Sequence, residues 1–115
     1  MLPKRMRLSR ATDIEKLRTA GKSWRHPLVI LLARKNRLEK SRFAFVASRR
    51  VGNAVTRNRA KRLLRESIGT ELNLIQPGWD CLLIARPAIA KARFTDLQTA
   101  VHQLLEKADL MVGER

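Results

Sequence analysis

The sequence predicts an α/β (α+β) two-layer sandwich in which three helices pack on a small central sheet. Three observations favour this class. Short apolar runs alternate with longer segments of helical periodicity, in the order helix, strands, basic helix, strand, helix. Turn-forming residues separate these segments. The length of 115 residues suits one compact domain over 1–115.

The N-terminal part combines a basic arm with a short helix. Residues 1–9 form the arm, and Pro3 argues against a helix within it. Thr12 and Glu15 then have the spacing of a capping box, and Gly21 offers a stop. We therefore expect a first helix between Thr12 and Gly21.

Two strands are expected before the basic helix. The apolar run 28–33 is too short and too β-branched to favour a helix, and the polar segment 34–41 reads as a loop. The next strand covers 43–47. Phe43 and Phe45 share one of its faces, and we expect them to belong to the core rather than to an RNA-stacking platform of the RNP1 type.

The remaining elements follow a break at Gly52 and Asn53. A basic helix is expected over 54–68, and a third strand over 81–85 after a turn. A final helix should begin at Thr95, which has capping-box spacing to Gln98. Its apolar seam consists of Leu97, Val101, Leu104, Ala108 and Met111.

Composition indicates a polyanionic partner. Twenty-five Lys and Arg against ten Asp and Glu give a formal charge of +15, far more than solubility requires. Cys81 is the single cysteine, so no internal disulfide can form, and we expect a cytoplasmic protein. The longest apolar run is far shorter than the roughly 20 residues that a membrane span needs, so no membrane partner is expected.

The densest charge cluster lies between Arg49 and Glu66, which reads RRVGNAVTRNRAKRLLRE. On a helical wheel five polar residues fall within an arc of about 140°: Arg57, Asn58, Lys61, Arg62 and Arg65. We expect the opposite side to pack on the sheet, with Ala60, Leu63, Leu64, Ser67 and Ile68. Arginine offers paired donors that match phosphate oxygens, so this helix predicts a nucleic-acid contact.

The string from Ser48 to Glu66 is similar to the signature of the bacterial ribonuclease P protein family. The resemblance is specific because glycine, valine and asparagine positions match along with the Arg-Asn-Arg triplet. It implies a ribosomal-protein-like fold with a left-handed β-α-β crossover, in which the crossover helix carries the motif. It also implies that a catalytic RNA with bound Mg²⁺ cleaves precursor transfer RNA, while the protein binds that RNA and the 5′ leader of the substrate.

The resemblance assigns residues to two sites. Those expected to contact the catalytic RNA are Arg49, Arg50, Asn53, Arg57, Asn58, Arg59, Lys61, Arg62 and Arg65. Those expected to line the leader cleft are Ile14, Arg18, Leu31, Ala44, Val46 and Ser48. The family commonly has aromatic residues where this chain has Ile14, Arg18 and Leu31, so leader binding should depend here on cations and apolar contact.

No catalytic residue or metal ligand is expected on the polypeptide. It shows no paired carboxylates, Ser-His arrangement or phosphate loop. Cys81, His26 and His102 read as structural residues. The alternatives are a structural or ribosomal RNA-binding protein without processing activity, a DNA-binding module, and a protein-only nuclease. The missing acidic cluster disfavours the last, and no DNA partner is expected.

Overall fold

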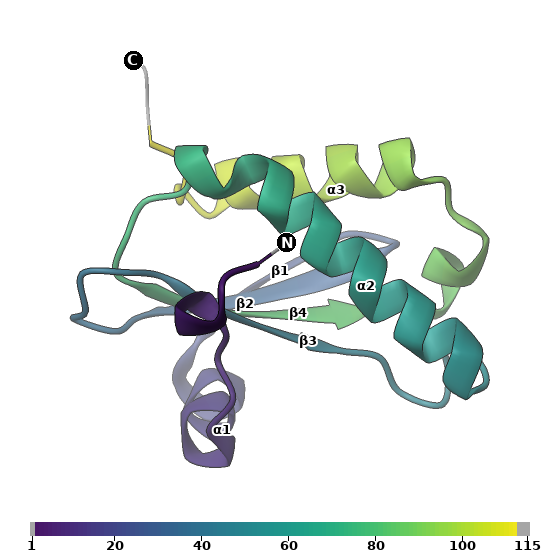
Figure 1. The fold of residues 1–115 in the computed structure, drawn as a ribbon, viewed down its shortest axis with the longest axis horizontal. Coiled ribbons are helices and arrows are strands. Elements are labelled where there is room, and N and C mark those ends of the chain that lie inside the picture. The colour runs from purple at the N-terminus through teal and green to yellow at the C-terminus, as the bar shows by residue number, and fades with distance from the viewer. Residues whose placement is uncertain (1, 113–115) are drawn as a thin grey trace.

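The computed structural model describes residues 2–112, so Met1 of the predicted arm and residues 113–115 lie outside it. Three consecutive strands follow the first α-helix, and the fourth strand lies between the last two α-helices in the chain order (Figure 1). In order, the elements are η1 (Lys4–Met6), α1 (Ala11–Ala20), β1 (Lys22–Arg25), β2 (Val29–Lys35), β3 (Arg42–Val46), α2 (Ala54–Glu71), η2 (Leu72–Leu74), β4 (Trp79–Ala85), η3 (Pro87–Lys91) and α3 (Phe94–Lys107).

The strands form one mixed sheet in the order β1-β2-β4-β3. β1 pairs antiparallel with β2, and β2 pairs antiparallel with β4. β3 and β4 are parallel neighbours, so the chain between them, which includes α2, makes a β-α-β crossover. The α+β class with three helices on a small sheet is confirmed. The left-handed sense of the crossover stays a prediction from the family.

Helices cover both faces of the sheet. α2 and α3 lie together on one face, and α1 lies alone on the other (Figure 1). Each strand alternates its side chains between the two faces. The larger core lies under α2 and α3 and contains Phe43, as predicted, with Leu31 and Leu83. The smaller core lies under α1, where Leu17 packs with Leu82 and Ala44.

Both predicted capping boxes are wrong. α1 and α3 each begin one residue before the expected threonine, and their N-caps Arg10 and Arg93 make no side-chain capping bond. Thr12 and Thr95 therefore lie inside the first turn. A threonine there cannot accept from an N–H two or three residues ahead in the manner of a cap, because it already has helical backbone.

The N-terminal arm is anchored rather than free. Leu2 and Leu8 are only 1% and 4% exposed, and the backbone N–H of Leu8 donates to the Phe43 carbonyl at 2.7 Å. A 3₁₀ turn follows Pro3, where no helix was expected. Edge strand β3 thus has the arm along its outer side.

Several element ends also differ from the predictions. Strand β1 was not predicted, and β2 runs two residues into the predicted loop. α2 continues through Gly69 to Glu71, since nothing about Gly69 forces a turn and its helical neighbours pack on α3. Met111 lies beyond α3 and forms a bridge with Ile75, so it is not part of the helical seam.

Candidate nucleic-acid interface

The start of α2 is fixed by three consecutive residues. Val51 is 5% exposed and anchors the loop in the core. Gly52 has φ +151°, and a Cβ there would lie 3.0 Å from Thr56, so the position favours glycine. Asn53 is the N-cap, and its Oδ1 accepts from the Thr56 N–H at 2.9 Å. The predicted RNA contact Asn53 therefore also sets where the helix begins.

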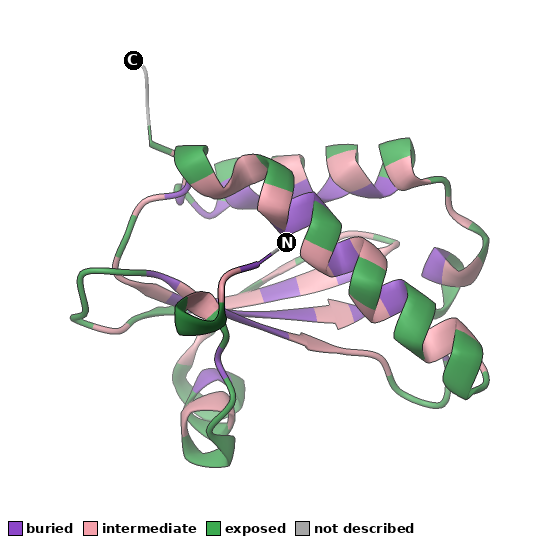
Figure 2. Cartoon of the chain, viewed as in Figure 1, coloured by how far each residue is buried: buried purple, intermediate pink, exposed green. Residues whose placement is uncertain are grey.

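α2 presents a buried stripe and a cationic face. Ala60, Leu64, Ser67 and Ile68 are buried, while Leu63 is only half-buried. The cationic face is the set of polar residues that remain accessible: Arg57, Asn58, Arg59, Lys61, Arg62 and Arg65. Figure 2 shows exposed and buried positions alternating along the helix.

The two sides of α2 are adjacent rather than opposite. Arg57 and Lys61 flank Ile68 on the helical wheel, about 20° to either side, so their stems are half-buried beside the stripe. Asn58 and Arg62 are exposed. Arg59 lies beyond Arg62, one turn earlier, and extends the face around the helix. These residues keep accessible surface, but the face begins at the edge of the core instead of lying opposite it as predicted.

The charge on this face is not neutralised by ion pairs among the described residues. No ion pair among residues 2–112 involves a cation of α2. Glu66 is exposed and is the single acidic residue between Ala54 and Thr70. Helix surfaces usually mix charge signs at i to i+4 spacing. The α2 surface instead repels cations along its length and attracts a polyanion.

The N-terminal arm extends the cationic face. An open hollow of about 620 Å³ lies between the arm and α2, lined by Leu2, Arg7, Arg62, Arg65 and Glu66. Arg65 is held in place because its guanidinium carbon lies 5.8 Å from the centre of the Phe45 ring. Arg7 was predicted only as part of a basic arm, and its position beside Arg62 and Arg65 depends on the buried anchors Leu2 and Leu8.

An exposed loop joins this face to the other side of the sheet. Ser48, Arg49 and Arg50 follow β3 and are all exposed. The Ser48 Oγ accepts from the Arg50 N–H at 3.3 Å, which tightens the turn. The loop therefore places two guanidinium groups between the last residue of β3, Val46, and the first turn of α2.

On the α1 side, an apolar row crosses the sheet next to α1. Ile30 is opposite Ile84, and Ile84 is opposite Val46, so the three side chains share one face. All three are half-buried. The neighbouring row of Leu32, Leu82 and Ala44 packs under α1. This apolar row, Ile30, Ile84 and Val46, is thus the part of the sheet surface that remains accessible beside α1.

The predicted cleft residues do not share one environment. Val46 belongs to the apolar row, half-buried Ile14 packs against the α1-side core, and Arg18 and Ser48 are exposed. Ala44 is 7% exposed and is largely covered. The assignment of Leu31 is wrong.

Leu31 lies on the opposite face of the sheet. It is paired with Leu83, is 1% exposed, and packs in the core under α2 and α3. Its neighbours Ile30 and Leu32 point to the α1 side instead. Sequence reasoning missed Ile30 and Ile84, because a continuous apolar run does not show which alternate residues face which side of the sheet until the pairing register is known.

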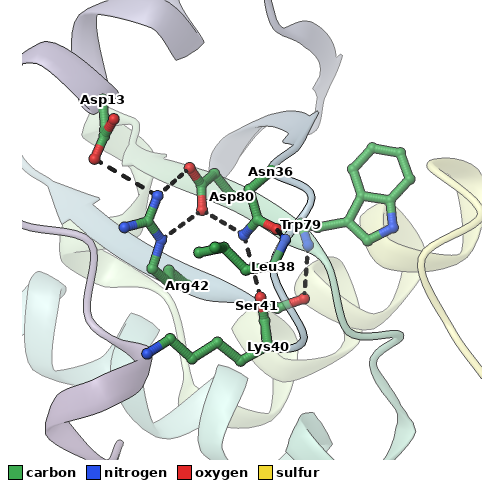
Figure 3. Close-up of polar contacts among 8 residues, drawn as sticks. All are labelled: Asp13, Asn36, Leu38, Lys40, Ser41, Arg42, Trp79 and Asp80. Atoms are coloured by element: carbon green, nitrogen blue, oxygen red, sulfur yellow. Dashed lines mark hydrogen bonds and ion pairs between the residues drawn. The ribbon is translucent and has the colours of Figure 1, made fainter.

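One arginine ties α1 to the end of the sheet. Arg42 donates through Nε and Nη2 to the two carboxylate oxygens of Asp80, at 2.9 and 2.7 Å, and its Nη2 lies 3.5 Å from Asp13 on α1 (Figure 3). Asn36 donates to Asp80 at 2.8 Å. These bonds keep the pKa of the Arg42 guanidinium above its usual value, chiefly through the hydrogen bond to Asp80. The group is a structural brace.

The remaining candidate groups have structural roles. Cys81 is fully buried, and burial raises the pKa of its thiol far above the usual range, so it is not a nucleophile. His26 Nδ1 accepts from the Leu28 N–H at 3.0 Å. His102 bridges Glu71 and Glu106, at 2.6 and 3.3 Å. Among residues 2–112, no group of three potential metal-binding side chains comes together.

Comparison with known proteins decides the family. Residues 2–109 match the model of the family described as Ribonuclease P. The chain belongs to the ribonuclease P protein family. It is 38% identical over 108 residues to a ribonuclease P protein component of Roseiflexus castenholzii, covering 93% of this chain and 88% of that protein. The component from Roseiflexus sp. strain RS-1 is 40% identical over 106 residues, covering 91% and 87%.

Solved ribonuclease P proteins have the same fold. The RNase P protein from Thermotoga maritima superposes with a TM-score of 0.80 at 28% identity, covering 88% of this chain and 96% of that one. Members of this family are RNA-binding subunits of ribonuclease P in transfer RNA 5′ processing, and this chain is one of them. No helix within residues 2–112 is long and apolar enough to cross a membrane.

Proposed function

We propose that the chain assists a catalytic RNA in removing the 5′ leader from precursor transfer RNA in the cytoplasm. In this proposal the cationic face binds the catalytic RNA, and the surface formed by α1 and the apolar row binds the leader. The observation that carries it is continuity: the loop of Ser48, Arg49 and Arg50 connects the two surfaces. The catalytic RNA and the leader can therefore meet where the chain turns from β3 into α2.

The cationic face acts by neutralising phosphates where two polyanions converge. Arginine donors match phosphate oxygens in pairs, and their release of condensed counterions favours binding. Contact with 6 to 10 phosphates would make affinity fall roughly 10³- to 10⁵-fold between 50 and 200 mM salt. The cations of α2 support this, because none of them takes part in an ion pair among residues 2–112.

The leader site would bind without stacking. Phe43 and Phe45 lie on the face under α2 and α3, and the apolar row on the α1 side is aliphatic. Apolar contact with Val46 and Ile84 and charge from Arg18 give affinity that depends little on base identity. A leader of varied sequence suits such a surface, since hydrogen-bond readout of bases is not built into it.

We further propose that the RNA carries the catalysis and holds most of the Mg²⁺. The described carboxylates do not converge on a metal position, and Asp80 is taken up by Arg42 and Asn36. When bound to the RNA, magnesium would activate the attacking water and stabilise the leaving oxygen. The chain's own groups would bind, orient and screen charge.

Cleavage of precursor transfer RNA by the catalytic RNA at low magnesium, with and without the chain, tests the proposal. The expected result is faster cleavage with the chain, and a larger gain for a precursor with a leader of several nucleotides than for one with a single-nucleotide leader. A structural RNA-binding protein would bind without raising the rate. Equal binding of duplex DNA would favour the DNA-binding alternative.

A further inference from the structure

A second hollow lies at the other end of the sheet from the cationic face. It has a volume of about 350 Å³, and it opens beside edge strand β1 and its neighbour β2, next to the end of α3. α2 packs over β3 and β4, whereas α3 packs over β1 and β2. Both tryptophans of the chain, Trp24 and Trp79, line this hollow. It is also separate from the apolar row, which lies on the α1 side.

The pairing register places tryptophan rings and lysine side chains next to one another around the hollow. Trp24 is opposite Leu31, Lys22 is opposite Ala33, and Trp79 is opposite Lys35. Leu31 and Ala33 are buried under α2 and α3, so all of these residues are on that face. Lys22 therefore lies between Trp24 and the Lys35–Trp79 pair. The Lys35 Nζ is 5.8 Å from the centre of the Trp79 ring.

We call this site the tryptophan hollow and define it by Lys22, Trp24, Lys35 and Trp79, with Arg34 at its rim. Its aromatic rings and cations are the groups that bind the bases and phosphates of nucleotides. The rings are half-buried and pack against the core, which holds them in place. The three cations are exposed, and no ion pair within residues 2–112 involves them. Surfaces that bind single-stranded nucleic acid combine aromatic rings with unneutralised cations in this way.

We propose that the tryptophan hollow binds an unpaired RNA nucleotide, with a base against a tryptophan ring and its phosphates near Lys22, Arg34 and Lys35. This is a third RNA contact, separate from the proposed leader surface and from the cationic face. The nucleotide can come from the precursor transfer RNA or from the catalytic RNA, because both offer the same base and phosphate. The inference does not require the leader to lie on the apolar row.

Intrinsic fluorescence tests this directly, because both tryptophans line the hollow and the chain has no tyrosine. The full-length chain is titrated with an oligouridylate of about eight nucleotides, and with an abasic oligomer of the same length. We expect saturable quenching by the oligouridylate and little by the abasic chain. Trp24→Phe and Trp79→Phe variants show which ring responds. Titration with catalytic RNA and with precursor transfer RNA then identifies the source.

Charge variants keep the test independent of tryptophan packing. Lys22→Ala/Lys35→Ala alters two exposed side chains, so its circular dichroism should match the wild type, and oligouridylate should bind about tenfold more weakly. Arg57→Ala/Lys61→Ala/Arg62→Ala should keep the quenching, because that face is elsewhere. Binding of oligouridylate by anisotropy with unchanged tryptophan emission would overturn the inference. So would wild-type affinity in the lysine variant, and neither result would affect the proposed function.

Discussion

Arg42 makes a two-pronged hydrogen bond to Asp80, with Nε–Oδ1 and Nη2–Oδ2 distances of 2.9 and 2.7 Å, and also faces Asp13 at 3.5 Å. Both partners of the close pair are largely buried, with side chains 22% and 11% exposed. The pair connects β3 to β4 and, through Asp13, to α1. It therefore sets the position of α1 beside the apolar row.

Removing Arg42 should destabilise the protein because it leaves the Asp80 carboxylate buried without its cation. We expect Arg42→Ala to cost about 2 to 4 kcal/mol in unfolding free energy, measured by urea denaturation. Asp13→Ala is the matched control, and it should cost less than about 1 kcal/mol because its ion pair is longer and more exposed. Equal losses in the two variants would show that Arg42 acts mainly through α1.

The two faces of β2 can be separated by neighbouring substitutions. Leu31→Ala should cost about 2 to 5 kcal/mol in unfolding free energy, since it opens a cavity in the larger core. Ile30→Ala should cost clearly less, because the side chain is half-buried, yet it should weaken binding of precursor relative to mature transfer RNA. Denaturation and competitive binding measure the two effects. A larger loss of stability in Ile30→Ala, together with weaker precursor binding in Leu31→Ala, would support the original assignment of Leu31 to the leader site.

An aromatic ring beside the apolar row should strengthen leader binding. Ile14 is half-buried on α1 and packs against the α1-side core. Ile14→Phe should tighten binding of a precursor with a long leader by about fivefold or more, because stacking on a base contributes about 1 to 3 kcal/mol. Mature transfer RNA should bind as before. Lys16→Phe, on an exposed part of the same helix, is the control, and an equal gain there would refute the assignment.

His102 should make stability depend on pH. The hydrogen bond to Glu71 holds the pKa of the imidazole above its usual value of 6.5. The folded state therefore binds this proton more tightly than the unfolded state does. Protonated His102 stabilises the fold below pH 6.5, and this stabilisation is lost as pH rises through the elevated pKa.

Unfolding free energy of the wild type relative to His102→Gln should therefore fall as pH rises from below 6.5 through the elevated pKa of His102. The fall should be less than about 1 kcal/mol, because the side chain is 40% exposed. The glutamine variant provides the reference, since other groups titrate equally in both proteins. A difference that grows with pH would contradict the assignment of the Glu71 contact.

Local sequence patterns predicted the elements with strong periodicity. The buried stripe of α2, the strand of Phe43 and Phe45, and most of the seam of α3 follow from apolar spacing alone. β1 was missed because its sequence, KSWR, has one apolar residue and lies at an edge. The buried anchors Leu2 and Leu8 were missed because a single apolar residue among cations carries no periodicity.

The site required pairing information that the sequence lacks. The cationic face is local to one helix, so its residues could be predicted together. The apolar row unites β2, β4 and β3, and a shift of one residue exchanges the faces, which is why Leu31 was assigned in place of its neighbours. The tryptophan hollow likewise unites residues more than 50 positions apart, through the register of three strands.

The most direct test of the account is the binding of catalytic RNA by two triple variants that lose equal charge. Arg57→Ala/Lys61→Ala/Arg62→Ala removes cations from the face of α2, and Lys16→Ala/Lys40→Ala/Lys107→Ala removes exposed cations from elsewhere. Both should remain folded by circular dichroism. We expect the first variant to bind at least about 100-fold more weakly than the second. The slope of its log affinity against log salt concentration should be smaller in magnitude by about two. Equal affinity and equal salt dependence in the two variants would contradict the account.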